Sequence, residues 1–293
     1  MRKFAITVLA TALTLPAQAA AKADPAIPLA RVSKWEMNYS PDNCQLMARF
    51  GTGEDSLLLA ISREQPGDEF DIHLYGQTLK YDGIAVPIEL SFGASGATKR
   101  YEGLALTTGG EVKLPVVRIT GLRIDGWDDV RHPERAPEVT RANEAAITAI
   151  TFKKAGGKRY RLEAGSLGPP LAAMRTCVAD LLKTWGYDPA VEGSLTRRAM
   201  PATKPSTWAK GADFPPSALN QGHNGLVRFR LDIDPAGLPT TCTVLYRTNP
   251  DDFADRSCKL LIERARFSPA LDASGKPVKS YYINSIRWVA GGW

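Results

Sequence analysis

Short apolar or alternating runs separated by turn residues occupy much of the chain between Trp35 and Leu162, and they constrain the fold more than any other feature. Runs of this length bounded by Gly, Pro, Asp or Asn are typical of β-strands. The Gly156-Gly157 pair stands between two of the runs, where a hairpin turn needs residues that accept a positive φ. The predicted strands are residues 44–50, 56–63, 70–75, 86–92, 147–153 and 158–162.

One amphipathic helix follows these strands. Pro169 and Pro170 suit its first turn, and Gly186 is the residue at which it should end. Its apolar positions recur at helical spacing and are Leu171, Met174, Cys177, Val178, Leu181 and Leu182. We therefore expect a β-rich N-terminal domain, residues 24–187, that this helix closes.

Residues 188–212 carry Pro and Gly with little apolar periodicity. A loop of this length is more than a compact domain normally contains. The sequence thus predicts a linker here and a second domain over residues 213–293.

The second domain has a strand–strand–helix–strand pattern. Apolar residues alternate with charged ones from Val227 to Ile233, so one face of this strand should be buried and the other should face water. The next strand should place Cys242, Val244 and Tyr246 on one side. A helix is expected from the segment 249–252, and a last strand over 278–289. The predicted fold class is α+β.

The first residues have the pattern of an export signal. Met1-Arg2-Lys3 precedes an apolar run to Leu15, and Ala17-Gln18-Ala19 follows Pro16. This pattern is typical of a secretory signal peptide, here residues 1–19, because the apolar run is shorter than the about 20 residues that span a membrane. We expect a periplasmic protein with no transmembrane segment in the mature chain.

Composition and charge exclude several classes. The hydrophobic fraction is 44%, too high for a disordered chain. The formal charge is +6, and removal of Arg2 and Lys3 leaves 6 − 2 = +4. Because the charges alternate in sign and form no basic run, nucleic acid is not an expected partner.

Export gives the four cysteines a structural meaning, since an even number in an oxidising compartment is typical of disulfides. Cys242 on a strand and Cys258 on the next helix both lie at core-facing positions, so we expect them to pair. Cys44 and Cys177 then pair within the first domain. Buried free thiols are the alternative. No metal site is expected, because there is no Cys-x-x-Cys and only three histidines are present.

None of the histidines, His73, His132 and His223, has a nucleophile motif beside it. Phosphate-binding Gly-rich loops are also missing from the sequence. No cofactor and no catalytic residue is predicted. A carbohydrate platform is the alternative interpretation of the tryptophans, which are scattered over different elements: Trp127, Trp185, Trp208, Trp288 and Trp293.

Several short motifs in the last 80 or so residues resemble the TonB C-terminal domain family. Phe214-Pro215 with Ala218 resembles the aromatic-Pro pair and Ala of that family, and the strand motifs Gly225-Leu226-Val227, Asp234 with Gly237, and Val244 follow its first hairpin. After Phe253, the segments 266–270 (RFSPA) and 275–278 (GKPV) resemble two of its signatures.

The resemblance implies a non-enzymatic domain that binds an envelope protein, for example an outer-membrane TonB-dependent transporter, by strand addition. In that family the last strand is the docking edge. By resemblance, the binding residues are Phe214, Pro215, Tyr281, Tyr282, Ile283, Asn284, Ser285, Ile286, Arg287 and Trp288. On this basis a proline at Asn284 is expected to block docking. The chain end or a second copy could instead cover the edge, the latter as a homodimer through the terminal strand.

The sequence also departs from that family. The usual uncleaved membrane helix and Pro-rich spacer are replaced by a cleavable signal and a folded domain, and Asp213 stands where many members have Gln. Force transmission from the inner membrane is therefore in question. Two alternatives remain open: an envelope scaffold or peptidoglycan- or ligand-binding protein, and an exported enzyme with its site in the first domain.

Overall fold

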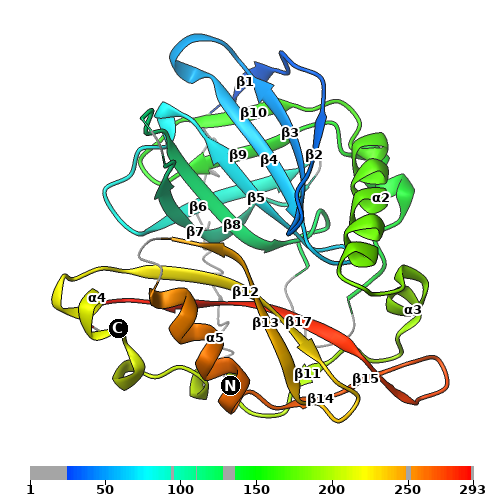
Figure 1. Ribbon diagram of the computed structural model, residues 1–293. Coiled ribbons are helices and arrows are strands. Elements are labelled where there is room, and N and C mark those ends of the chain that lie inside the picture. The colour runs from blue at the N-terminus through cyan, green and yellow to red at the C-terminus, as the bar shows by residue number, and fades with distance from the viewer. Residues whose placement is uncertain (1–24, 94–95, 110, 128–135, 249–251, 292–293) are drawn as a thin grey trace, which may run out of the picture.

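The computed structural model describes residues 25–93, 96–109, 111–127, 136–248 and 252–291. Residues 1–19, His132, the helix start at 249–251 and Trp293 lie outside these ranges. Figure 1 shows a β-barrel in the upper half, helix α2 along its side and a three-stranded sheet with a helix below it. The α+β class predicted from the sequence is confirmed.

The N-terminal domain is a ten-stranded sheet in the order β1-β10-β9-β6-β7-β8-β5-β4-β3-β2. The strands are β1 (Ile27–Ala30), β2 (Glu36–Tyr39), β3 (Cys44–Phe50), β4 (Leu57–Arg63), β5 (Phe70–Tyr75), β6 (Ala85–Phe92), β7 (Lys99–Thr107), β8 (Pro115–Leu122), β9 (Ile150–Lys154) and β10 (Arg159–Glu163). Among the strands that the structure describes, only β1 and β10 pair in parallel. Gly156 in the β9–β10 hairpin has φ +68°, as that turn required.

The first segment closes this sheet. β1 pairs with β10 at one edge, and β2 pairs with β3 at the other. Between them the Val32 N–H donates to the Arg49 carbonyl and the Gly51 N–H to the Ala30 carbonyl. One strand-like segment therefore joins both edges, and closure leaves no long unpaired edge on the barrel.

Helix α2 (Gly168–Thr184) covers the side of the barrel next to β2 and β3. Its predicted apolar face is buried, and Cys177 on that face is bonded to Cys44 at the start of β3. Short α1 (Arg141–Ala146) packs against α2. Gly186, with φ +79°, follows the end of α2, in agreement with the predicted stop.

The sequence missed β1, β2, β7 and β8. β7 alternates less clearly because its charged residues Lys99, Arg100 and Glu102 stand on both faces of the strand, and Gly103 interrupts the run. β1 and β2 are four residues each, and their pairing depends on distant strands. Local pattern therefore underestimates strands whose stability comes from closure of the barrel.

The C-terminal region forms a three-stranded antiparallel sheet in the order β13-β12-β17. The elements are α4 (Pro216–Asn220), β12 (Gly225–Ile233), β13 (Pro239–Arg247), α5 (Asp252–Arg264), β14 (Phe267–Ser268), β15 (Ala270–Leu271), β16 (Pro277–Val278) and β17 (Ser280–Trp288). α5 packs on β12 and β13, and Cys258 on this helix is bonded to Cys242 on β13. Both predicted disulfides are thus present.

Tyr246 does not share a face with Cys242 and Val244, contrary to the prediction for β13. The register with β12 shifts between Arg228 and Phe229, which reverses the alternation beyond that point. Leu245 is buried as a result, whereas Tyr246 is 40% exposed. A bulge of this kind cannot be inferred from alternation within one strand.

Residues 188–212 are ordered along the C-terminal domain, although the sequence indicated a linker. They contain α3 (Pro189–Ser194) and β11 (Met200–Pro201), and β11 pairs with β14. The Thr196 N–H donates to the Leu271 carbonyl, and Trp208 is 2% exposed in the core beside Phe229. The boundaries at 187/188 and 212/213 remain predictions.

Candidate partner-binding edge

Strand β17 forms one edge of the C-terminal sheet. It pairs with β12 without interruption, from Gly225 opposite Trp288 to Ile233 opposite Ser280. Among the residues that the structure describes, no strand pairs with its other side. We call that side the free edge of β17. An unpaired strand edge presents backbone donors and acceptors to which another chain can add.

The alternation of backbone direction identifies which residues face this edge. The Leu226 carbonyl accepts from the Thr248 N–H, and Thr240 donates to the Asp232 carbonyl, so the even-numbered residues of β12 face β13. The odd-numbered ones, such as Phe229, face β17 and bond to their partners there, such as Asn284. The backbone groups that alternate with these, such as those of Ile283 and Ser285, therefore point away from β12 to the free edge.

The Ser285 N–H supports this assignment, because it donates to its neighbour's side-chain oxygen, Asn284 Oδ1, at 2.8 Å. Asn284 Nδ2 in turn donates to the Tyr282 hydroxyl at 2.6 Å. The side chain of Asn284 thus occupies a backbone donor of the free edge. The N–H of residue 284 faces β12, so a proline there would break the hydrogen bonds to β12. Residue 285 faces the free edge, so a proline at Ser285 tests that edge.

The predicted binding residues fall into two groups. Tyr282 to Arg287 are half-buried along β17. The others are buried supports: Phe214 packs edge-on against Trp288 with ring centroids 5.6 Å apart, and Trp288 stacks on Phe253. Pro215 is buried beside them. Phe214 lies beside Trp288, as expected from the sequence, but both side chains are buried.

The start of β17 is held against the barrel side of the molecule. Tyr281 packs against Trp185 and Tyr187, with ring centroids 5.8 and 5.0 Å away. The Tyr187 hydroxyl donates to Asp232 Oδ1 at 2.8 Å and lies 3.0 Å from the Ser280 carbonyl oxygen, a second possible acceptor. Burial raises the pKa of Tyr187, and the hydrogen bond to Asp232 raises it further, so this hydroxyl keeps its proton and remains a donor.

The charged face of β12, expected to face water, is the surface that contacts the barrel. Arg230 is 7% exposed and lies over the Trp185 ring, 4.2 Å from its centroid. Arg228 forms an ion pair with Glu64, which follows β4. Alternation correctly separated the two faces of this strand, but a charged face can be buried when each charge has a partner. Trp185, whose indole N–H donates to the Pro41 carbonyl, thus contacts both domains.

Asp213 anchors the entry to the C-terminal domain. Its carboxylate accepts hydrogen bonds from Arg264 at 2.5 and 2.9 Å and from Arg256 at 3.0 Å, both on α5. The hydrogen bonds from Arg264 lower the pKa of Asp213 to about 2. The residue that departs from the family pattern therefore has a structural role here, which sequence reasoning did not recognise.

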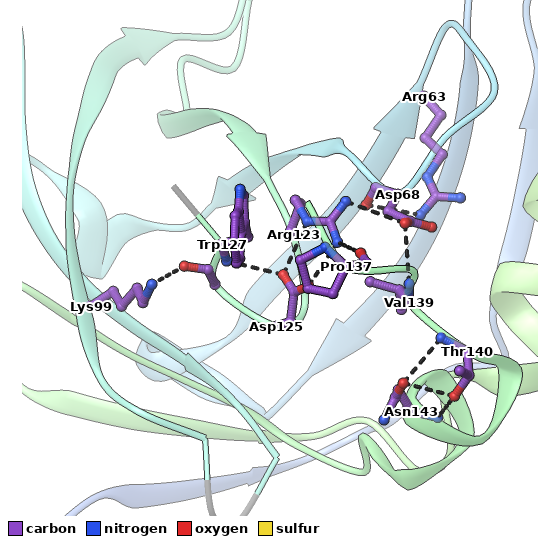
Figure 2. A network of polar contacts seen from close by, with 11 residues as sticks. Arg63, Asp68, Lys99, Arg123, Asp125, Trp127, Pro137, Val139, Thr140 and Asn143 are labelled. Carbon is purple, nitrogen blue, oxygen red and sulfur yellow. Dashed lines mark hydrogen bonds and ion pairs between the residues drawn. The ribbon is translucent and has the colours of Figure 1, made fainter. Parts of the chain in front are cut away.

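A separate polar network lies at one end of the barrel, as Figure 2 shows. Arg123 donates to both carboxylate oxygens of Asp125, to Asp68 and to the Pro137 carbonyl. Asp68 also accepts from the Val139 N–H at 3.2 Å. All of these groups are paired with one another, so the network fastens the segment after β8 to the β4–β5 turn.

The tryptophans do not form a platform within the described ranges. Trp208 and Trp288 are buried in the C-terminal core, and Trp185 lies between the domains. Over the same ranges no group of three or more His, Cys, Asp or Glu side chains is placed to hold a metal ion. None of the described helices has the length and apolarity needed to cross a membrane.

No curated protein sequence matches the chain. Residues 210–290 match the family described as the Gram-negative bacterial TonB protein C-terminal, which confirms the resemblance for this part of the chain.

Proposed function

We propose that the protein is periplasmic and that it binds an envelope partner by strand addition. An extended segment of the partner would pair with the free edge of β17. The observation that carries this proposal is the edge itself. β17 is paired on one side only among the described strands, and Ile283 and Ser285 direct their backbone groups away from β12. The match of residues 210–290 supports an interaction role for this domain.

The compartment is proposed on two grounds. The segment 1–19 has the pattern of an export signal, and the bonded pairs Cys44–Cys177 and Cys242–Cys258 fit an oxidising environment. The partner we propose is an outer-membrane TonB-dependent transporter, whose N-terminal segment would supply the added strand. The competing hypothesis is that two copies of the protein pair with each other through the free edge of β17.

The experiment measures binding of labelled peptides that copy transporter N-terminal segments to the purified protein and to two variants. Ser285→Pro removes the N–H that donates to Asn284 Oδ1 and places a ring at the free edge, where it obstructs an added strand, while the ladder to β12 keeps its own donors. Ser285→Ala removes only the hydroxyl and is the matched control. We expect Ser285→Pro to weaken binding at least tenfold and Ser285→Ala to bind like the wild type.

Two results would contradict the proposal. Equal binding by Ser285→Pro would place the peptide elsewhere, provided that thermal unfolding shows the variant to be folded. Absence of binding to the wild-type protein would remove the transporter as partner. If sedimentation then shows a dimer that Ser285→Pro dissociates, the edge serves self-association.

A further inference from the structure

A cleft of about 280 Å³ lies where the barrel meets the C-terminal sheet. One wall is the outer surface of β3, β4, β5, β7 and β8, and the opposite wall is Arg228 on β12 with Tyr246 on β13. Clefts between domains are frequent ligand sites. This one exists only because the two domains contact each other. It lies beside β13, at the opposite edge of the sheet from β17.

The cleft is lined by the polar side chains of Gln45, Ser62, Tyr75 and Tyr246. Gln45 and Tyr75 are half-buried and Tyr246 is 40% exposed, and none of the three forms a side-chain hydrogen bond with another described residue. Their amide and hydroxyl groups are therefore open to a molecule in the cleft. His73 and Arg118 complete the wall, with His73 Nε2 and Arg118 Nε buried behind its surface. A polar molecule in the cleft could take over the hydrogen bonds that the accessible groups otherwise make to water.

The charges around the cleft are already balanced. Arg118 is paired with Asp71 at 2.8 Å, and Arg228 is paired with Glu64. Burial lowers the pKa of His73 to about 4, so its imidazole is uncharged near neutral pH. An ionic ligand would lose its hydration here without gaining a counter-charge. The cleft therefore favours a neutral molecule.

We propose that this cleft binds one ring of a neutral sugar, either free or as a unit of a glycan. Sugar hydroxyls both donate and accept, as do the hydroxyls and the amide that line the cleft. The rings of Tyr75 and Tyr246 provide aromatic surface for the apolar face of the sugar. The volume lies just below the about 300 Å³ of the smallest drug-sized pockets, so one ring is the appropriate size.

The test is calorimetric titration of the purified protein with glucose, galactose, N-acetylglucosamine and chitotetraose. We expect saturable binding of at least one of them. Gln45→Ala and Tyr75→Phe should each weaken it about tenfold, as expected for one lost hydrogen bond. Thr176→Ala, an exposed change on α2, is the control and should bind like the wild type. Tighter binding of chitotetraose than of the single sugars would identify a glycan as the source, and equal binding a free sugar.

The proposal is overturned if none of the four sugars binds at millimolar concentration, which would mean that the cleft holds only water. It is also overturned if both variants bind like the wild type. Tyr75→Phe removes a single hydroxyl and keeps the ring, so it still gives a result if Gln45→Ala does not fold. None of these outcomes depends on whether β17 binds a peptide.

Discussion

The guanidinium of Arg228 donates from Nε to both carboxylate oxygens of Glu64, at 2.7 and 2.6 Å, and so links the C-terminal sheet to the barrel. The two residues are 164 positions apart in the chain. Their side chains are only 18% and 10% exposed. The ion pair lies in an interface that also contains Arg230 over Trp185 and the hydrogen bond from Tyr187 to Asp232. The two domains therefore contact through paired polar groups.

Glu64→Gln should destabilise the protein, because it leaves the largely buried charge of Arg228 without a counter-charge. We expect a loss of about 1–3 kcal/mol in the free energy of unfolding, measured by urea titration. The matched control is Asp180→Asn, which breaks an exposed pair with Lys183 and should cost less than about 1 kcal/mol. Equal losses in both variants would show that the Glu64–Arg228 pair adds nothing to the interface.

Phe229→Ala should lower the stability of the C-terminal domain. Phe229 is 1% exposed and packs near Tyr282 and Trp208 in the core. Truncation of a buried Phe leaves a cavity and costs about 3–5 kcal/mol. Ile262→Ala, at a position 38% exposed on α5, should change stability by about 0.5 kcal/mol or less in the same urea titration. A small effect at Phe229 would contradict the packing described.

Asp213→Asn should change the pH dependence of stability. The pKa of Asp213 is lowered from 3.8 to about 2 by hydrogen bonds from Arg264, so the folded state favours the carboxylate. The stabilisation is fully present above the unfolded pKa and is lost as pH falls toward 2. The difference between the wild type and Asp213→Asn should therefore be largest above about pH 4 and shrink below it.

Urea titrations at a series of pH values measure that difference, and Asp255→Asn, an exposed change on α5, is the control. A difference between the wild type and Asp213→Asn that stays constant down to about pH 2 would show that Asp213 does not titrate as described.

The two disulfides should contribute separately to stability. Cys242 and Cys258 close a loop of 16 residues, for which the chain-entropy account gives about 3 kcal/mol. Cys44 and Cys177 are 133 residues apart and should contribute more, about 5 kcal/mol. Unfolding of the two double Cys→Ser variants tests the order. A larger loss for the Cys242–Cys258 pair would contradict it.

Sequence reasoning succeeded where a residue's role is local. The apolar face of α2, the positive φ of Gly156 and the motifs around Phe214 and Phe267 are all decided within a few residues. The disulfides followed because each Cys lies at a core-facing position of a predictable element. These features made the fold class and the C-terminal resemblance predictable.

What the sequence did not reveal depends on distant contacts. The charged face of β12 resembles a solvated face until Glu64 and Trp185 are placed against it. The bulge beside Arg228 changes the side on which Tyr246 lies, and only pairing with the neighbouring strand reveals it. The outward direction of the Ser285 backbone likewise depends on the register between β17 and β12.

The most direct test of the strand-addition account is amide hydrogen exchange with and without a transporter segment peptide. On β17, the amide of Ile283 faces outward and should exchange more slowly when the peptide is bound. On β13, Thr243 is opposite Arg230, whose backbone groups face β13, so the amides of Cys242 and Val244 point outward. The exchange of these two amides should not change. Slower exchange at Ile283, with no change on β13, is the result that the account predicts. Slower exchange on β13, or at neither edge while the peptide is bound, would contradict it.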